Sequence, residues 1–133
     1  AEEYRQIIAP LKFELFRDEL RLRRFAATQI LLDRALAEGG SVPDIKYFQG
    51  ELYSARRNDE DITKAEAAFR ESVQHAEAPA EAYRELAMIY MKSGRGDQAI
   101  PLFQTYLERE PEAFDRGMVD AYIRQINSGG SSE

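Results

Sequence analysis

Few side chains in this sequence could carry out chemistry. His75 is the only histidine, and the chain has no cysteine. A lone histidine near the end of a helix is usually solvated or interacts with the helix dipole, and no second histidine is present to complete a zinc site with it. The lack of cysteine excludes disulfides, thiolate zinc sites and cysteine nucleophiles.

Two short polar segments hold groups that bind ions in other proteins. Residues 58–61 read "NDED" and lack the alternating ligands, the glycine and the distal glutamate of an EF-hand loop. Residues 93–98 read "SGRGDQ" and have neither the lysine nor the spacing of a phosphate-binding loop. Both are interpreted as turns, and carboxylates are too widespread for any pair to be nominated as an acid and a base. We therefore expect a non-enzyme with no metal or cofactor.

A basic stripe is the remaining chemical feature. Arg17, Arg21 and Arg24 are four and then three residues apart, which places them on one face of a helix. Such a stripe is usually a solvated face. As a binding site it would dock an acidic segment or a terminal carboxylate of a partner.

Composition limits the class of protein. The 133 residues are 44% hydrophobic and 32% charged with a net charge of −6, which suits a soluble globular domain. The absence of a Lys/Arg-rich block argues against nucleic-acid binding. No apolar run has the roughly 18 residues that a membrane span needs, and the start "AEEYRQIIAP" does not resemble a signal peptide. The first residue is Ala, which fits either a cleaved leader or a fragment of a longer protein.

The sequence repeats itself with a period of 34 residues. A shift of 34 pairs Leu52 with Leu86, Ala65 with Ala99, Phe69 with Phe103 and Val73 with Leu107. A shift of 37 pairs Leu15 with Leu52, Phe16 with Tyr53, Phe25 with Ile62, Leu32 with Phe69 and Leu36 with Val73. Small residues four positions from aromatic ones suit helices that cross closely, so each unit is predicted to be a two-helix hairpin.

Capping signals predict where these helices begin and end. Ser41, with Pro43 and Asp44 after it, predicts a helix to about Arg57. Asp61, or Thr63 with Glu66, predicts the start of the next helix, which ends near residue 77. Asp97 is a candidate cap for a later helix, and Pro101 is expected at the edge of that turn. Met118, Val119, Tyr122, Ile123 and Ile126 predict a last amphipathic helix.

The N-terminal third allows two interpretations. Six of the eight positions that follow alternating steps of four and three from Leu11 to Leu36 are apolar, a pattern that one long helix over residues 11–37 would also satisfy. We favour a hairpin because the downstream repeats provide a context for it.

Residues 80–113 resemble the tetratricopeptide repeat, a 34-residue helix-turn-helix unit. Tyr83, Leu86, Ala87 and Tyr90 match the first helix of the family, Gly94 its turn, and Ala99, Phe103 and Pro111 the small, aromatic and terminating positions. Residues 46–79 diverge at Gln49, Tyr53 and Arg56, and residues 9–42 diverge at Lys12, Phe16 and Glu19 and have no glycine at the turn.

The resemblance implies an all-α fold, a right-handed α-solenoid of antiparallel helix pairs. A single domain over residues 1–127 would comprise units at about 9–42, 46–79 and 80–113, a capping helix at about 114–127 and a flexible tail at 128–133.

In this family the first helix of each unit lines a concave groove that binds peptides. The resemblance implies a groove formed by Phe13, Arg17, Tyr47, Ser54, Arg57, Arg84, Met88, Met91, Met118 and Tyr122. For the four last-named residues, from Met88 on, a packed core is the favoured alternative, because apolar residues at helical spacing more often pack than bind. The family's carboxylate clamp is not reproduced, because Phe13, Arg17, Glu51, Glu81 and Glu85 stand at its positions.

The leading hypothesis is a non-catalytic scaffold that binds a protein or peptide partner. The alternative is a regulatory or substrate-positioning module of a larger enzyme, since the chain resembles repeat regions appended to bacterial exported proteases. The sequence leaves the source organism and the compartment open, and a bacterial periplasmic or cytoplasmic location is what that resemblance would imply. Weak homodimerisation through exposed repeat ends is a further expectation.

Overall fold

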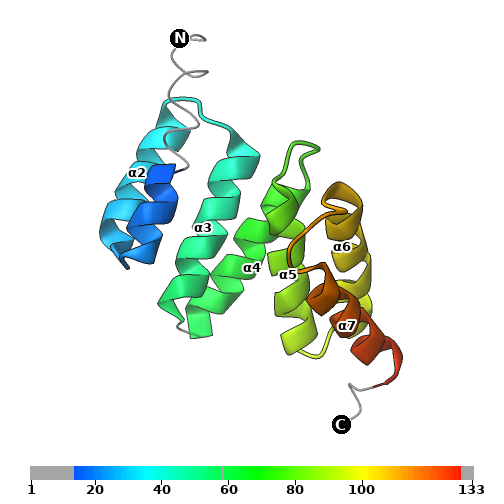
Figure 1. Ribbon diagram of the computed structural model, residues 1–133. Coiled ribbons are helices and arrows are strands. Elements are labelled where there is room, and N and C mark those ends of the chain that lie inside the picture. Colours follow the sequence, from blue (N-terminus) through cyan, green and yellow to red (C-terminus); the bar gives the residue numbers. More distant parts are fainter. Residues whose placement is uncertain (1–13, 58, 130–133) are drawn as a thin grey trace. The chain divides into compact units, whose positions relative to one another are not determined.

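Every regular element in the described residues, 14–57 and 59–129 of a computed structural model, is helical. Residues 14–21 form the first helix. The others are α2 (Phe25–Ala37), α3 (Val42–Arg56), α4 (Asp59–Val73), α5 (Ala80–Lys92), α6 (Gly96–Arg109) and α7 (Arg116–Asn127), as shown in Figure 1. The predicted all-α class is confirmed. In these ranges no helix is long and apolar enough to cross a membrane.

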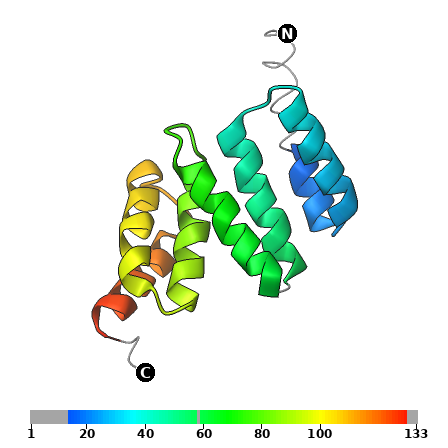
Figure 2. The ribbon, with the colours of Figure 1, turned by 180° about the vertical axis from the view of Figure 1, so that it is seen from behind.

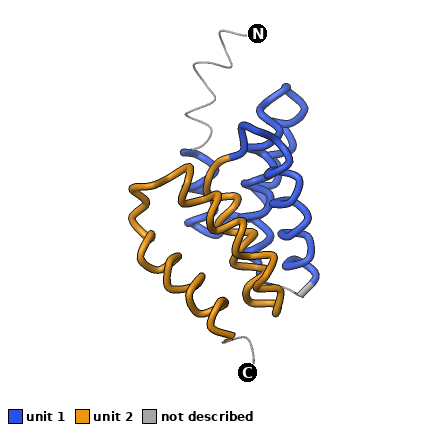
Figure 3. Tube along the Cα trace, turned by 90° about the vertical axis from the view of Figure 1, so that its right-hand side faces the viewer, with its two compact units in different colours: residues 1–78 blue, residues 79–133 orange. Residues whose placement is uncertain are grey.

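The chain divides into two compact units, Ala1–Ala78 and Pro79–Glu133 (Figure 3). In unit 1, α3 packs against both α2 and α4, and α3 and α4 lie side by side in opposite views (Figures 1 and 2). In unit 2, α6 packs against both α5 and α7. Within each unit, these neighbours in sequence are thus partners in space. A single domain over residues 1–127 with right-handed curvature stays a prediction, and most of the expected tail lies outside the described residues.

The first helix and α2 form a hairpin, as predicted, and a single helix over residues 11–37 is wrong. The chain turns at Arg23, whose φ of 59° lies in the left-handed region. The Arg23 N–H bonds to the Leu20 carbonyl oxygen, and the Arg24 N–H bonds to that of Glu19. Arg57 (φ 63°) has the same conformation in the turn after α3. At the corresponding turn between α5 and α6 the residue with positive φ is Gly94 (φ 78°). An arginine can therefore replace the turn glycine at a cost of about 1–2 kcal/mol.

The predicted start of α4, at Asp61 or at Thr63, is two or four residues too late. The helix begins at Asp59, so Asp61 lies inside it and is neither its cap nor part of a solvated turn. The Asp61 side chain is 3% exposed, and its Oδ2 lies 3.4 Å from Arg56 Nε at the end of α3. Burial against this guanidinium, together with acidic residues near the positive end of the helix dipole, explains the earlier start. The helix ends at Val73, so His75 lies beyond it rather than in its last turn.

The N-cap predicted for α6 and the predicted place of Pro101 are also wrong. Arg95, not Asp97, is the N-cap residue, and Asp97 lies in the first turn. Pro101 is inside the helix rather than at the edge of the turn. Its missing N–H leaves the Asp97 carbonyl without the usual intrahelical donor. By contrast, Ser41 is confirmed as the N-cap of α3, with Pro43 and Asp44 in the first turn.

The 34-residue period identifies the core. Leu52, Ala65, Phe69, Leu86, Ala99 and Phe103 are all fully or almost fully buried. The upstream correspondence with a period of 37 holds less well. Leu15 and Leu36 are each 42% exposed, so Leu15 does not share the burial of Leu52, whereas Phe16 and Leu32 are buried.

Contact between α3 and α4 depends on a glycine. A Cβ atom on Gly50 would lie 2.4–2.6 Å from three ring carbons of Phe69, whose side chain is fully buried. These distances are far below van der Waals contact, so the Phe69 ring lies directly on the α3 backbone. Gly117 in α7 offers a comparison, because nothing lies within 4 Å of the Cβ it would carry.

We predict that Gly50→Ala lowers the free energy of unfolding by about 1–3 kcal/mol, since the buried ring cannot move aside without strain. Gly117→Ala, the control, should change it by less than about 1 kcal/mol and in the stabilising direction. Urea titration followed by circular dichroism measures both. Equal stability of the two variants would contradict the close contact.

Candidate functional site

A continuous series of aromatic rings connects three helices of unit 1. The Phe16 ring of the first helix lies 5.2 Å from the Phe48 ring of α3, and the Phe48 ring lies 5.0 Å from that of Tyr47. The Tyr47 ring lies 6.0 Å from the Phe69 ring of α4. All four side chains are buried, and ring pairs at such separations attract beyond the effect of area alone. The first helix is thereby held at a fixed position on α3.

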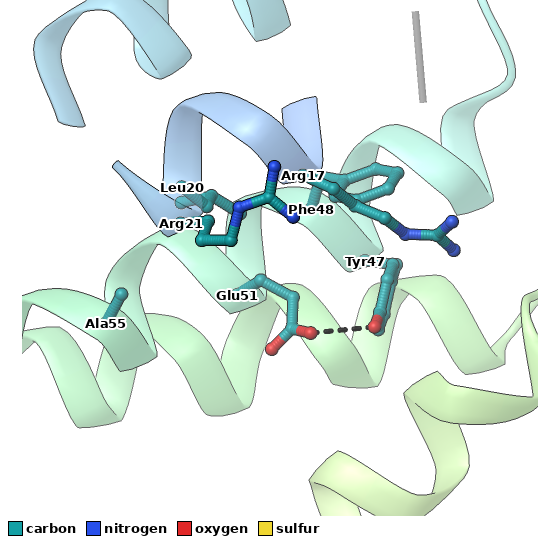
Figure 4. Close-up of a pocket in the computed structure, with 7 residues that line it drawn as sticks. All are labelled: Arg17, Leu20, Arg21, Tyr47, Phe48, Glu51 and Ala55. Carbon is teal, nitrogen blue, oxygen red and sulfur yellow. Dashed lines mark hydrogen bonds between the residues drawn. The ribbon is translucent and has the colours of Figure 1, made fainter. Parts of the chain in front are cut away.

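A pocket of about 300 Å³ lies between these two helices (Figure 4). The first helix contributes Arg17, Leu20 and Arg21 to its lining, and α3 contributes Tyr47, Phe48, Glu51 and Ala55. The α3 residues recur at helical spacing, so they share one face of that helix. The pocket therefore combines an apolar surface with charged groups from two helices.

The charges of the two walls are opposite. On the α3 wall, the Tyr47 hydroxyl donates to Glu51 Oε2 at 2.7 Å. On the other wall, Arg21 Nη2 lies 2.6 Å from Asp18 Oδ1, and the side chains of this pair are 74% and 48% exposed. Such an exposed pair contributes little and exchanges partners readily. Arg17 is exposed, and no acidic side chain among the described residues pairs with it.

The predicted basic stripe is wrong at its third member. The first helix ends at residue 21, and Arg24 is the N-cap residue of α2, beyond a sharp turn. The Arg24 guanidinium instead pairs with Glu19 at 3.2 Å. Arg17 and Arg21 remain together, and both line the pocket.

The predicted groove residues of unit 1 are only partly brought together. Arg17 and Tyr47 meet at the pocket. Ser54 is half-buried on α3, and Arg57 is exposed at the end of that helix. Phe13 lies outside the described residues. Leu20, Phe48 and Ala55 were missed, although Ala55 follows Glu51 by four residues and shares its helix face.

In unit 2, Arg84 is engaged in an internal network rather than presented to solvent. Its guanidinium donates to Glu85 Oε2 at 2.9 Å, to Asp115 Oδ2 at 3.3 Å and to the Tyr106 hydroxyl at 3.4 Å. The Tyr106 hydroxyl donates to Asp115 Oδ1 at 2.7 Å, and both residues are buried. The network joins α5, α6 and the N-cap of α7.

The network shifts two pKa values. Burial lowers the pKa of Arg84, but the charge of Glu85 and the hydrogen bonds of the network raise it more, so the guanidinium stays charged. Burial raises the pKa of Tyr106, and its hydrogen bond to Asp115 raises it further. Arg84 thus has a structural role, to hold the loop before α7 on α5 and α6.

The other predicted groove residues of unit 2 differ in exposure. Met88 and Met91 are half-buried on α5. Met118 is 52% exposed on α7, so the core alternative is wrong for it. Tyr122 is half-buried, and its ring lies 5.8 Å from that of Phe103 in α6. This contact fits the packing role that was the alternative to a binding role.

Comparison with known proteins supports the repeat interpretation. Residues 57–118 match the family model of the tetratricopeptide repeat. No curated protein and no solved structure matches the chain. The matched segment covers α4, α5, α6 and the beginning of α7.

The raised pKa of Tyr106 predicts a loss of stability in alkali. Below pH 10, the ordinary value, the hydroxyl is protonated in both the folded and unfolded states. As the pH rises above that value the unfolded chain loses its proton first, so the free energy of unfolding should fall until the folded pKa is passed. Tyr106→Phe should remove this part of the fall, whereas Tyr53→Phe, the control, should keep it. Urea unfolding between pH 8 and 11 measures the difference, and an unchanged fall in Tyr106→Phe would refute the assignment.

Proposed function

The chain is a tetratricopeptide-repeat protein, with its repeats recognised over residues 57–118, and on that premise we propose that it is a non-catalytic module that binds a segment of a partner protein. Proteins of this family generally mediate protein–protein interactions. The proposal places the binding surface on the first helices of the repeats. In unit 1 these are the helix of residues 14–21 and α3.

The pocket between these two helices is the observation that supports the proposal most. A volume of about 300 Å³ lies at the lower end of the range for ligand clefts and suits one or two side chains of a bound segment. Its lining joins aromatic and aliphatic surface to charged groups, the combination found where a partner is both anchored and oriented. The underlying aromatic rings are packed in advance, which lowers the entropy cost of binding. Binding along a groove that continues over unit 2, and weak homodimerisation, stay predictions.

Filling the pocket tests the proposal. Ala55→Trp would place an indole in the pocket, and Ala26→Trp on the exposed face of α2 is the matched control. The wild-type chain is first used to select binders from a displayed library of random twelve-residue peptides. We expect Ala55→Trp to weaken the selected peptides at least tenfold in fluorescence anisotropy and Ala26→Trp to leave them unchanged.

Circular dichroism provides the folding control for both tryptophan variants. If Ala55→Trp is helical and binds the selected peptides as tightly as the wild type, the pocket is not the binding site. A library that yields no binder at all would count equally against the proposal.

A further inference from the structure

We propose that the pocket of unit 1 recognises an acidic side chain, Asp or Glu, that is followed or preceded by an apolar residue in the partner segment. The inference rests on the proposed function and specifies the chemistry of the partner. It depends on the placement of Arg17, Arg21 and Glu51 and on the apolar residues among them.

The two arginines form a positively charged wall. Arg17 and Arg21 are one helical turn apart, and in Figure 4 both side chains extend from the first helix beside the pocket. A carboxylate offers two oxygens that suit guanidinium groups, and hydrogen bonds between the two are among the strongest in proteins. The exposed contact of Arg21 with Asp18 is easily exchanged for a ligand carboxylate, because both groups remain solvated.

Glu51 determines where the ligand carboxylate can lie. Its carboxylate stands on the opposite wall, where it accepts a hydrogen bond from Tyr47 (Figure 4). Because like charges repel, a ligand carboxylate is directed to the arginine wall. A basic ligand side chain fits less well, since it would meet two positive groups and one negative group.

Apolar surface lies between the charged groups. Phe48 is buried beneath the pocket, and Leu20 and Ala55 complete the apolar lining from the two helices. A residue next to the acidic one in the bound segment can place an aliphatic or aromatic side chain here. Removal of that surface from water adds affinity to the directional contact with the arginines.

The geometry favours a carboxylate from a side chain over one at a chain end. Terminal carboxylates are commonly held by a nest of free backbone N–H groups. Here the residues that line the pocket belong to helices, and side chains form its charged rim. Arg17 and Arg21 are exposed, so a side chain can reach them from a segment that passes over the pocket.

The test uses peptides selected by the full chain from the random library. Amidated synthetic copies are compared with copies in which each Asp or Glu is replaced by Asn or Gln, and with copies that carry a free terminal carboxylate. We expect the selected peptides to be enriched in Asp and Glu, and the amide replacement to weaken binding at least tenfold. Arg17→Glu/Arg21→Glu should lose these peptides, and Arg17→Gln/Arg21→Gln, the milder change, should weaken them. Arg34→Glu, on exposed α2 surface, should leave them unchanged.

Other outcomes separate the inference from the proposed function. Peptides that Ala55→Trp rejects, but that tolerate replacement of their acidic residues, would overturn the inference and leave the proposed function standing. Peptides that bind only with a free terminal carboxylate would also overturn it. Peptides that Ala55→Trp still binds would overturn both.

Discussion

The arrangement of unit 1 depends on one contact, that of the Phe69 ring with the α3 backbone at Gly50. A side chain at Gly50 would separate α3 from α4. With the ring seated there, Tyr47 packs against Phe69, Phe48 against Tyr47, and Phe16 against Phe48. Through these ring contacts, the position of the first helix depends on that of α4. Tyr47 and Phe48, the middle rings of this series, line the pocket, so its walls are fixed by buried rings rather than by its own charged groups.

The sequence predicted the fold well and part of the lining of the candidate pocket. A period of 34 residues identified buried positions such as Leu52, Phe69 and Phe103, because close packing of repeated helix pairs requires the same residue size at the same place. Helix ends were harder to predict. The start of α4 depends on burial of Asp61 against Arg56, a contact that capping preferences do not describe. The turn at Arg23 has no glycine to mark it, and only the repeated context favoured a hairpin there.

The sequence does not show which arginines stabilise the fold and which line the pocket. Their spacing along the helices is similar, but their neighbours in the structure differ. Arg84 was expected at a binding surface, yet it holds the loop before α7 through Asp115 and Tyr106. Arg24 is directed to Glu19 by the turn that ends the first helix. Arg17 and Arg21 stay on the pocket wall. An arginine with a buried carboxylate partner stabilises the fold, whereas an exposed one beside an apolar pocket can bind a partner.

Direct observation of the arginine side chains tests the central claim, that the pocket of unit 1 binds an acidic segment. In ¹H–¹⁵N spectra of the full chain, titration with an amidated selected peptide should shift the Nε–H resonances of Arg17 and Arg21 and the backbone amides of the first helix and α3. The Nε–H resonance of Arg84, within its network in unit 2, should stay in place. Shifts confined to unit 2, with Arg17 and Arg21 unaffected, would contradict the claim.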